Sequence, residues 1–98
     1  MEREQALQVL REHAGELRAR GVRHAALFGS VARGSAGSGS DIDILIELEP
    51  GAALDIFAYS ELKSDIAELF PGRVDVVNRD ALKPLLRQPT AKDAIYAF

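Results

Sequence analysis

The sequence predicts an α/β fold in which a small mixed β-sheet is flanked by helices. Three observations support this prediction: two long segments with helical spacing of apolar residues, short aliphatic runs typical of strands, and the alternation of these segments along the chain. The 98 residues fit a single domain, residues 1–98, because independent domains usually hold about 100–150 residues.

Two segments are predicted to be long helices. The first covers roughly residues 2–20 and stops at Gly21, and the second begins at Asp55 as N-cap and closes at Pro71-Gly72. In both segments the apolar side chains recur at spacings of three, four and three, which places them on one helix face. They are Leu7, Leu10, Ala14 and Leu17 in the first segment and Tyr59, Leu62, Ile66 and Leu69 in the second.

Three short runs are predicted to be strands: 24–28, 41–48 and 74–77. The middle run alternates, which is typical of a strand with one buried face, because successive side chains point to opposite sides of a sheet. One face carries Ile42, Ile44, Ile46 and Leu48, and the other carries Asp41, Asp43, Leu45 and Glu47.

The remaining segments connect these elements. Ser30 is a suitable N-cap for a short helical turn over 31–33, and the glycine- and serine-rich stretch 34–40 is predicted to be a loop. A short helix is expected from Pro84, followed by a turn or helix over 95–98. The predicted order is therefore helix, strand, short helix, strand, helix, strand, helix.

Composition excludes several classes of protein. The chain has no cysteine, which excludes disulfides, a thiol nucleophile and thiolate zinc sites. The start of the sequence is charged and no apolar run approaches the length of a membrane span, so no signal peptide, no membrane association and a cytoplasmic location are expected.

The charge of the chain is unevenly distributed. The net charge is -3, and residues 41–75 hold nine acidic side chains against Lys63 and Arg73. This acidic centre argues against a long nucleic acid as partner, which a broad basic face would bind. It is compatible with a divalent-metal site, and equally with a solvated acidic surface.

Asp41 and Asp43 are the first candidates for chemistry. Positions i and i+2 of a strand share a face, so the two carboxylates lie side by side. Carboxylates at this spacing can bridge a pair of Mg²⁺ ions, which compensates the repulsion between like charges on a strand. Taken alone, the Asp-x-Asp pattern also suits two side chains that face solvent.

Gly29 and Ser30 follow a predicted strand and open a short helix. A glycine lets a phosphate approach the backbone, and the amides and hydroxyl at a helix start can bind its oxygens, with Arg33 one turn further on. An ordinary turn with a good N-cap explains the same residues. Asp75 lies on the last predicted strand and joins the aspartate pair if the two strands are neighbours.

Together these residues resemble the signature of the DNA polymerase beta nucleotidyltransferase superfamily, which has a Gly-Ser pair and then Asp-x-Asp on a strand. The matching stretches are Gly29-Ser30-Val31-Ala32-Arg33-Gly34 and Ser40-Asp41-Ile42-Asp43-Ile44. The short chain is similar to the minimal nucleotidyltransferase (MNT) branch, in which a later strand carries a third acid, here Asp75. The resemblance implies the palm-like nucleotidyltransferase fold of polymerase beta.

It also implies transfer of AMP from ATP with two Mg²⁺ ions. By analogy Asp41, Asp43 and Asp75 are catalytic and hold the metals, and Gly29, Ser30 and Arg33 bind the nucleotide. Standalone members resemble antitoxins paired with a HEPN ribonuclease toxin, so the expected acceptor is a tyrosine of that partner. Two alternatives stay open: a binding module that neutralises its partner with little catalysis, and a small-molecule nucleotidyltransferase completed by a partner chain.

A partner or an oligomer is expected for a second reason. The core of so small a chain covers few large side chains. An exposed apolar surface is therefore predicted at Tyr59, Leu85, Leu86, Tyr96 and Phe98.

Overall fold

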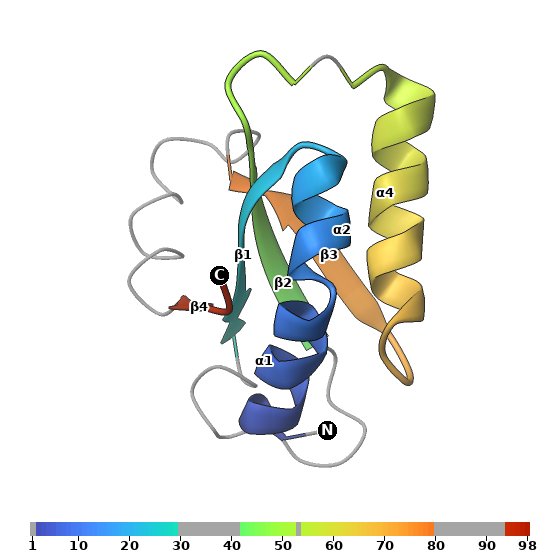
Figure 1. The fold of residues 1–98 in the computed structure, drawn as a ribbon. Helices are drawn as coiled ribbons and strands as arrows, with labels where there is room; N and C mark the ends of the chain where they lie inside the picture. Colours follow the sequence, from blue (N-terminus) through green and yellow to red (C-terminus); the bar gives the residue numbers. More distant parts are fainter. Residues whose placement is uncertain (1, 30–41, 53, 80–93) are drawn as a thin grey trace.

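Four strands form one sheet in the order β3-β2-β1-β4, with helices packed on one face (Figure 1). The computed structural model describes residues 2–29, 42–52, 54–79 and 94–98. The elements in chain order are α1 (Arg3–Glu12), α2 (Ala14–Ala19), β1 (Val22–Phe28), β2 (Ile42–Leu48), α4 (Ile56–Glu68), β3 (Val74–Asn78) and β4 (Ile95–Tyr96).

The sheet is mixed, as the sequence predicts. β1 pairs with β2 and with β4 antiparallel, whereas β2 and β3 run parallel. Parallel neighbours need a crossover connection, and α4 lies in the chain between β2 and β3. The predicted α/β fold class is confirmed.

The hydrophobic core lies between the sheet and the three helices. Aliphatic side chains dominate it, and the alternation along β1 and β2 supplies the sheet side, with Leu27 opposite Ile44 and Ala25 opposite Ile46. The predicted helical stripes supply the other side, although Ala14, Tyr59 and Leu69 are only partly buried. The buried cluster contains Ala6, Leu7, Leu10, Leu17, Val22, Ala25, Leu27, Ile42, Ile44, Ile46, Leu62, Ile66, Phe70 and Val76.

The N-terminal segment forms two helices, so the prediction of one continuous helix over 2–20 is wrong. The break falls at His13, whose backbone leaves helical geometry at φ -103° and ψ 8°. The His13 Nδ1 lies 2.9 Å from the Val9 carbonyl oxygen, which satisfies an acceptor at the end of α1. Gly15, a poor helix former, follows two residues later. Leu17 nevertheless stays buried, because the apolar stripe continues across the break.

The helix α4 confirms the expected N-cap. The Asp55 side chain accepts a hydrogen bond of 2.7 Å from the Ala58 backbone N–H. Such a cap satisfies one of the free amides at a helix start and stabilises the helix by about 1 kcal/mol.

The last residues form a strand, and the prediction of a turn or helix over 95–98 is wrong. Ile95 and Tyr96 pair with Leu27 and Ala26 of β1, and the Ala97 N–H donates to the Ala25 carbonyl at 2.8 Å. β1 would otherwise have an open edge, and an open strand edge is a template for pairing. A two-residue strand leaves no periodic pattern, so the sequence alone does not reveal it.

The face of the sheet opposite the helices is also partly apolar. Leu45 is buried there with 1% of its surface exposed, and its partner Ala26 is fully buried. The expectation that β2 has a single buried face is therefore wrong at Leu45. The predicted short turn at 31–33, the loop 34–40 and the helix from Pro84 lie outside the described residues.

The prediction of exposed apolar side chains is confirmed for Tyr96, and the two most exposed ones lie elsewhere. Tyr59 and Phe98 pack against the core, Tyr96 is 39% exposed, and Leu85 and Leu86 fall outside the described residues. Instead, Ile56 and Phe57 at the start of α4 are 76% and 81% exposed.

Candidate active site

Two aspartates meet where β2 and β3 run side by side. The parallel pairing puts Asp43 in register with Asp75, and neighbouring strands lie about 4.8 Å apart. Side chains in register point to the same face, here the face opposite the helices. Asp75 is exposed and Asp43 is partly buried. We call this pair the carboxylate end of the sheet.

Gly29 packs directly against this pair. It follows β1, where Phe28 is the register partner of Asp43, and its φ of +73° is one that L side chains rarely adopt. A Cβ at this position would overlap Asp43 Oδ2 and lie 3.3 Å from Asp43 Cγ. Any residue other than glycine would therefore displace the Asp43 carboxylate.

A cavity of about 310 Å³ opens beside the two aspartates. Its described lining consists of Asp43, Arg73, Val74 and Asp75. Two carboxylates and one guanidinium in a shared cavity can bind a cation and an anion next to each other. Nothing in the sequence singled out Arg73, although its spacing from Asp75 is the same two residues that define the Asp-x-Asp pattern.

The structure thus brings together three of the six predicted site residues: Asp43, Asp75 and Gly29. The other three, Ser30, Arg33 and Asp41, lie outside the described residues. Within the described part of the chain, no group of three or more histidine, cysteine, aspartate or glutamate side chains is arranged to hold a metal ion.

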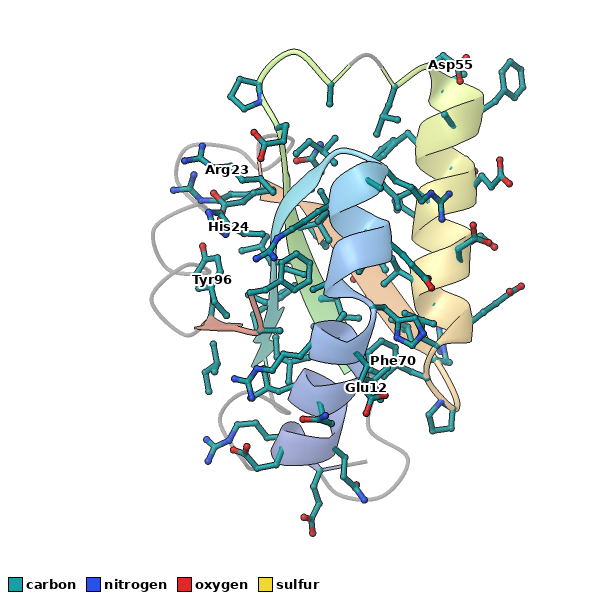
Figure 2. The ribbon with its side chains drawn as sticks, in the orientation of Figure 1. Glu12, Arg23, His24, Asp55, Phe70 and Tyr96 are labelled. Atoms are coloured by element: carbon teal, nitrogen blue, oxygen red, sulfur yellow. The ribbon has the colours of Figure 1, made fainter. Side chains whose placement is uncertain are left out.

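A second polar cluster occupies the other end of the same sheet face, and we call it the ion-pair end. Arg79 Nη1 lies 3.4 Å from Glu47 Oε1. The rings of His24 and Tyr96 pack edge to face with centroids 5.8 Å apart. Figure 2 labels both residues, with Arg23 next to them. Burial raises the pKa of Tyr96, and the adjacent Glu47 carboxylate raises it further, against a smaller lowering by Arg79.

The ion-pair end borders a cavity of about 410 Å³ lined by Arg23, His24, Glu47, Tyr96 and Phe98. The His24 Nδ1 lies 3.2 Å from the Phe98 carbonyl oxygen, which holds the last residue against β1. The ion-pair end differs from the carboxylate end because its acidic side chain, Glu47, lies beside a basic side chain and not beside a second acid in register. None of the helices in the described residues is long and apolar enough to cross a membrane.

Comparisons with known proteins agree with this architecture. Residues 10–97 match the model of the nucleotidyltransferase domain family. The protein adenylyltransferase MntA of Thermococcus cleftensis is 36% identical over 89 residues, covering 90% of this chain and 88% of the relative.

Two solved structures share the fold. One is described as a minimal nucleotidyltransferase, with 38% identity, a TM-score of 0.74, and coverage of 97% of this chain and 95% of that one. The other is a tri-AMPylated HEPN toxin of Shewanella oneidensis in complex with an MNT antitoxin, with 23% identity, a TM-score of 0.63, and coverage of 94% and 71%. At that identity the second likeness concerns the fold alone. The chain therefore belongs to the nucleotidyltransferase domain family, and it is an enzyme of the minimal nucleotidyltransferase type.

Proposed function

We propose that this nucleotidyltransferase moves AMP from ATP to a tyrosine hydroxyl of a HEPN toxin and thereby acts as an antitoxin in the cytoplasm. The observation that carries the proposal is the register of Asp43 with Asp75, with Gly29 held against the Asp43 carboxylate. The name of the Thermococcus relative, a protein adenylyltransferase, supports a protein as acceptor. The AMPylated toxin of the Shewanella complex supports the class of partner.

The carboxylate end fits Mg²⁺. Carboxylate oxygens are the ligands that this hard cation prefers, and Asp43 and Asp75 stand in register and line the same cavity. Asp43 and Asp75, together with Asp41, would hold two ions. When bound, the ions supply positive charge that stabilises the attacking and leaving oxygens of the transferred phosphoryl group.

The residues of the chain have separate tasks in this reaction. Gly29 leaves room for Asp43 and for the triphosphate, while Ser30 and Arg33 bind the β- and γ-phosphates. The acceptor oxygen forms a bond to the α-phosphorus, and the bond from the α-phosphorus to the bridging oxygen of the β-phosphate breaks. Pyrophosphate leaves with that electron pair, and Asp75 takes the hydroxyl proton.

The experiment is an intact-mass measurement of a HEPN toxin after incubation with the enzyme, ATP and Mg²⁺. The expected result is a gain of whole AMP units, which disappears with Asp75→Asn and with EDTA. Peptide mapping then identifies the modified residue. If the mass is unchanged while the toxin is still neutralised, the adenylylation proposal is wrong.

A second candidate function is neutralisation by binding alone. The specific observation in its favour is the exposure of Ile56 and Phe57, at 76% and 81%, side by side at the start of α4. Neighbouring exposed apolar side chains are typical of a contact surface for another protein. Under this alternative, Phe57→Ser releases the toxin and Asp43→Ala does not; adenylylation predicts that Asp43→Ala restores toxicity.

A further inference from the structure

Arg73 shares the cavity of the carboxylate end but has no role in the function proposed above. It precedes β3, and its carbonyl accepts a hydrogen bond of 3.0 Å from the Ile42 N–H, which fixes its backbone to β2. The period of two along a strand puts Arg73 on the same face as Asp75. The side chain is exposed and lines the cavity of about 310 Å³ beside Asp43.

The guanidinium of Arg73 has no ion-pair partner among the described residues, although this part of the sequence is rich in acidic side chains. Residues 41–75 contain nine acidic side chains and two basic ones. The other base, Lys63, lies 5.3 Å from the centre of the Tyr59 ring. Among the described residues Arg73 has no ion-pair partner, so its guanidinium can bind a group that comes from outside the chain.

The geometry of phosphoryl transfer indicates which group that is. Attacking and leaving oxygens lie roughly in line on opposite sides of the phosphorus. Gly29 adjoins β1, so a triphosphate bound there places the leaving pyrophosphate on the β1 side of Asp43. The acceptor must then approach from the other side, where Asp75 of β3 and the preceding residue Arg73 lie.

We propose that Arg73 is an acceptor-binding residue that selects a protein whose modified hydroxyl lies next to a carboxylate. This inference rests on the proposed protein acceptor. A guanidinium binds a carboxylate through two parallel hydrogen bonds, which fixes orientation as well as position. Bound cations would neutralise the charges of Asp43 and Asp75. Among the described residues that line the cavity, Arg73 would then be the charged side chain that attracts an anionic acceptor.

The test measures steady-state transfer of labelled AMP to the HEPN partner by the wild type and by Arg73→Ala, Arg73→Lys and Arg73→Glu. The KM for the partner is expected to rise about tenfold to a hundredfold in Arg73→Ala. Arg73→Glu should raise it further through repulsion, and Arg73→Lys should recover part of the loss. The KM for ATP should stay unchanged in all three variants. Arg23→Ala is the matched control, because Arg23 is also exposed but lies at the far end of β1.

Several outcomes would overturn the assignment. A rise in the KM for ATP alone would make Arg73 a nucleotide-binding residue, and unchanged kinetics would remove it from the site. Equal losses in Arg73→Ala and Arg73→Glu would point to stacking on an aromatic ring instead of a carboxylate. Each of these results leaves protein adenylylation intact. Failure of the wild type to label the partner would instead count against the proposed function.

Discussion

The two ends of the sheet face opposite the helices lie on the same pair of strands but bring together different kinds of side chain. At the carboxylate end, β2 and β3 bring Asp43 and Asp75 into register. Four residues further along the chain in each case, Glu47 of β2 and Arg79, which follows β3, form an ion pair. The carboxylate end therefore places two acidic side chains in register, whereas the ion-pair end places an acidic side chain beside a basic one.

This difference suits the carboxylate end to binding a ligand and the ion-pair end to a structural contact between strands. Opposite charges across neighbouring strands stabilise the sheet without any added group, and like charges destabilise it. A cation bound between two carboxylates in register would offset their repulsion. The contrast predicts that equal changes at the two ends have unequal consequences for activity.

The largest expected effect is that of Asp43→Asn. The substitution keeps the shape of the side chain and removes one charge from the carboxylate end, so nucleotidyl transfer should fall by about a thousandfold or more. The variant should also bind Mg²⁺ more weakly, because one carboxylate ligand is lost. A label-transfer assay with [α-³²P]ATP and thermal unfolding with and without Mg²⁺ measure both properties.

The wild type should gain melting temperature on addition of Mg²⁺, and Asp43→Asn should gain less. Glu47→Gln is the control, since it removes one charge from the same strand and face. Equal Mg²⁺ responses in the wild type and Asp43→Asn would contradict a metal site at the carboxylate end.

The next effect is that of Gly29→Ala. The added Cβ would overlap Asp43 Oδ2, and the φ of +73° disfavours any L side chain. We expect a loss of stability of about 1–3 kcal/mol, and a fall in transfer larger than that loss explains, because the carboxylate must move. Urea unfolding gives the first quantity, and the transfer rate of the folded fraction gives the second.

Gly15→Ala is the control for Gly29→Ala. Nothing lies within 4 Å of a Cβ built at Gly15, and no positive φ restricts it. Full activity in Gly29→Ala would show that the Asp43 carboxylate need not keep its place.

A smaller effect is expected from Glu47→Gln at the ion-pair end. The side chains of Arg79 and Glu47 are 38% and 21% exposed, so solvent screens their attraction. Loss of the pair should cost about 0.2–1 kcal/mol of unfolding free energy, with no change in nucleotidyl transfer. Urea unfolding in low and high salt checks the charge dependence, and a marked loss of activity would show that the two ends work as one site.

The sequence predicts the contrast between the two ends only in part. The alternation of β2 and the stripe of α4 follow from local periodicity, and the Asp43 and Gly29 positions follow from a compact motif. The register of Asp43 with Asp75 depends on the parallel pairing of β2 and β3, which neither strand encodes by itself. The partnership of Glu47 with Arg79 depends on the same register.

Other features were missed because their signals are weaker still. The break at His13 arises from a side chain that binds the Val9 carbonyl, against an apolar stripe that continues unbroken. The strand β4 is two residues long and exists because β1 offers an edge. The two-residue spacing of Arg73 from Asp75 predicts that both side chains lie on the same face of the strand. That spacing indicates a site residue only when β3 is known to border the site.

The smallest expected effect concerns the titration of Tyr96. Burial raises its pKa, the Glu47 carboxylate raises it further, and Arg79 lowers it. Glu47→Gln should therefore bring the pKa of Tyr96 down toward the ordinary value, and Arg79→Gln should bring it up.

Because the folded state favours the neutral phenol of Tyr96, the stability that this preference contributes is complete below the unfolded pKa of about 10. It is lost as the pH rises through the folded pKa. The phenolate absorbance measures the shift in a Tyr59→Phe background, since the chain has only two tyrosines. Asp43→Asn is the control, because it lies at the carboxylate end; a shift in that variant equal to the one in Glu47→Gln would mean that the two ends are not electrostatically separate.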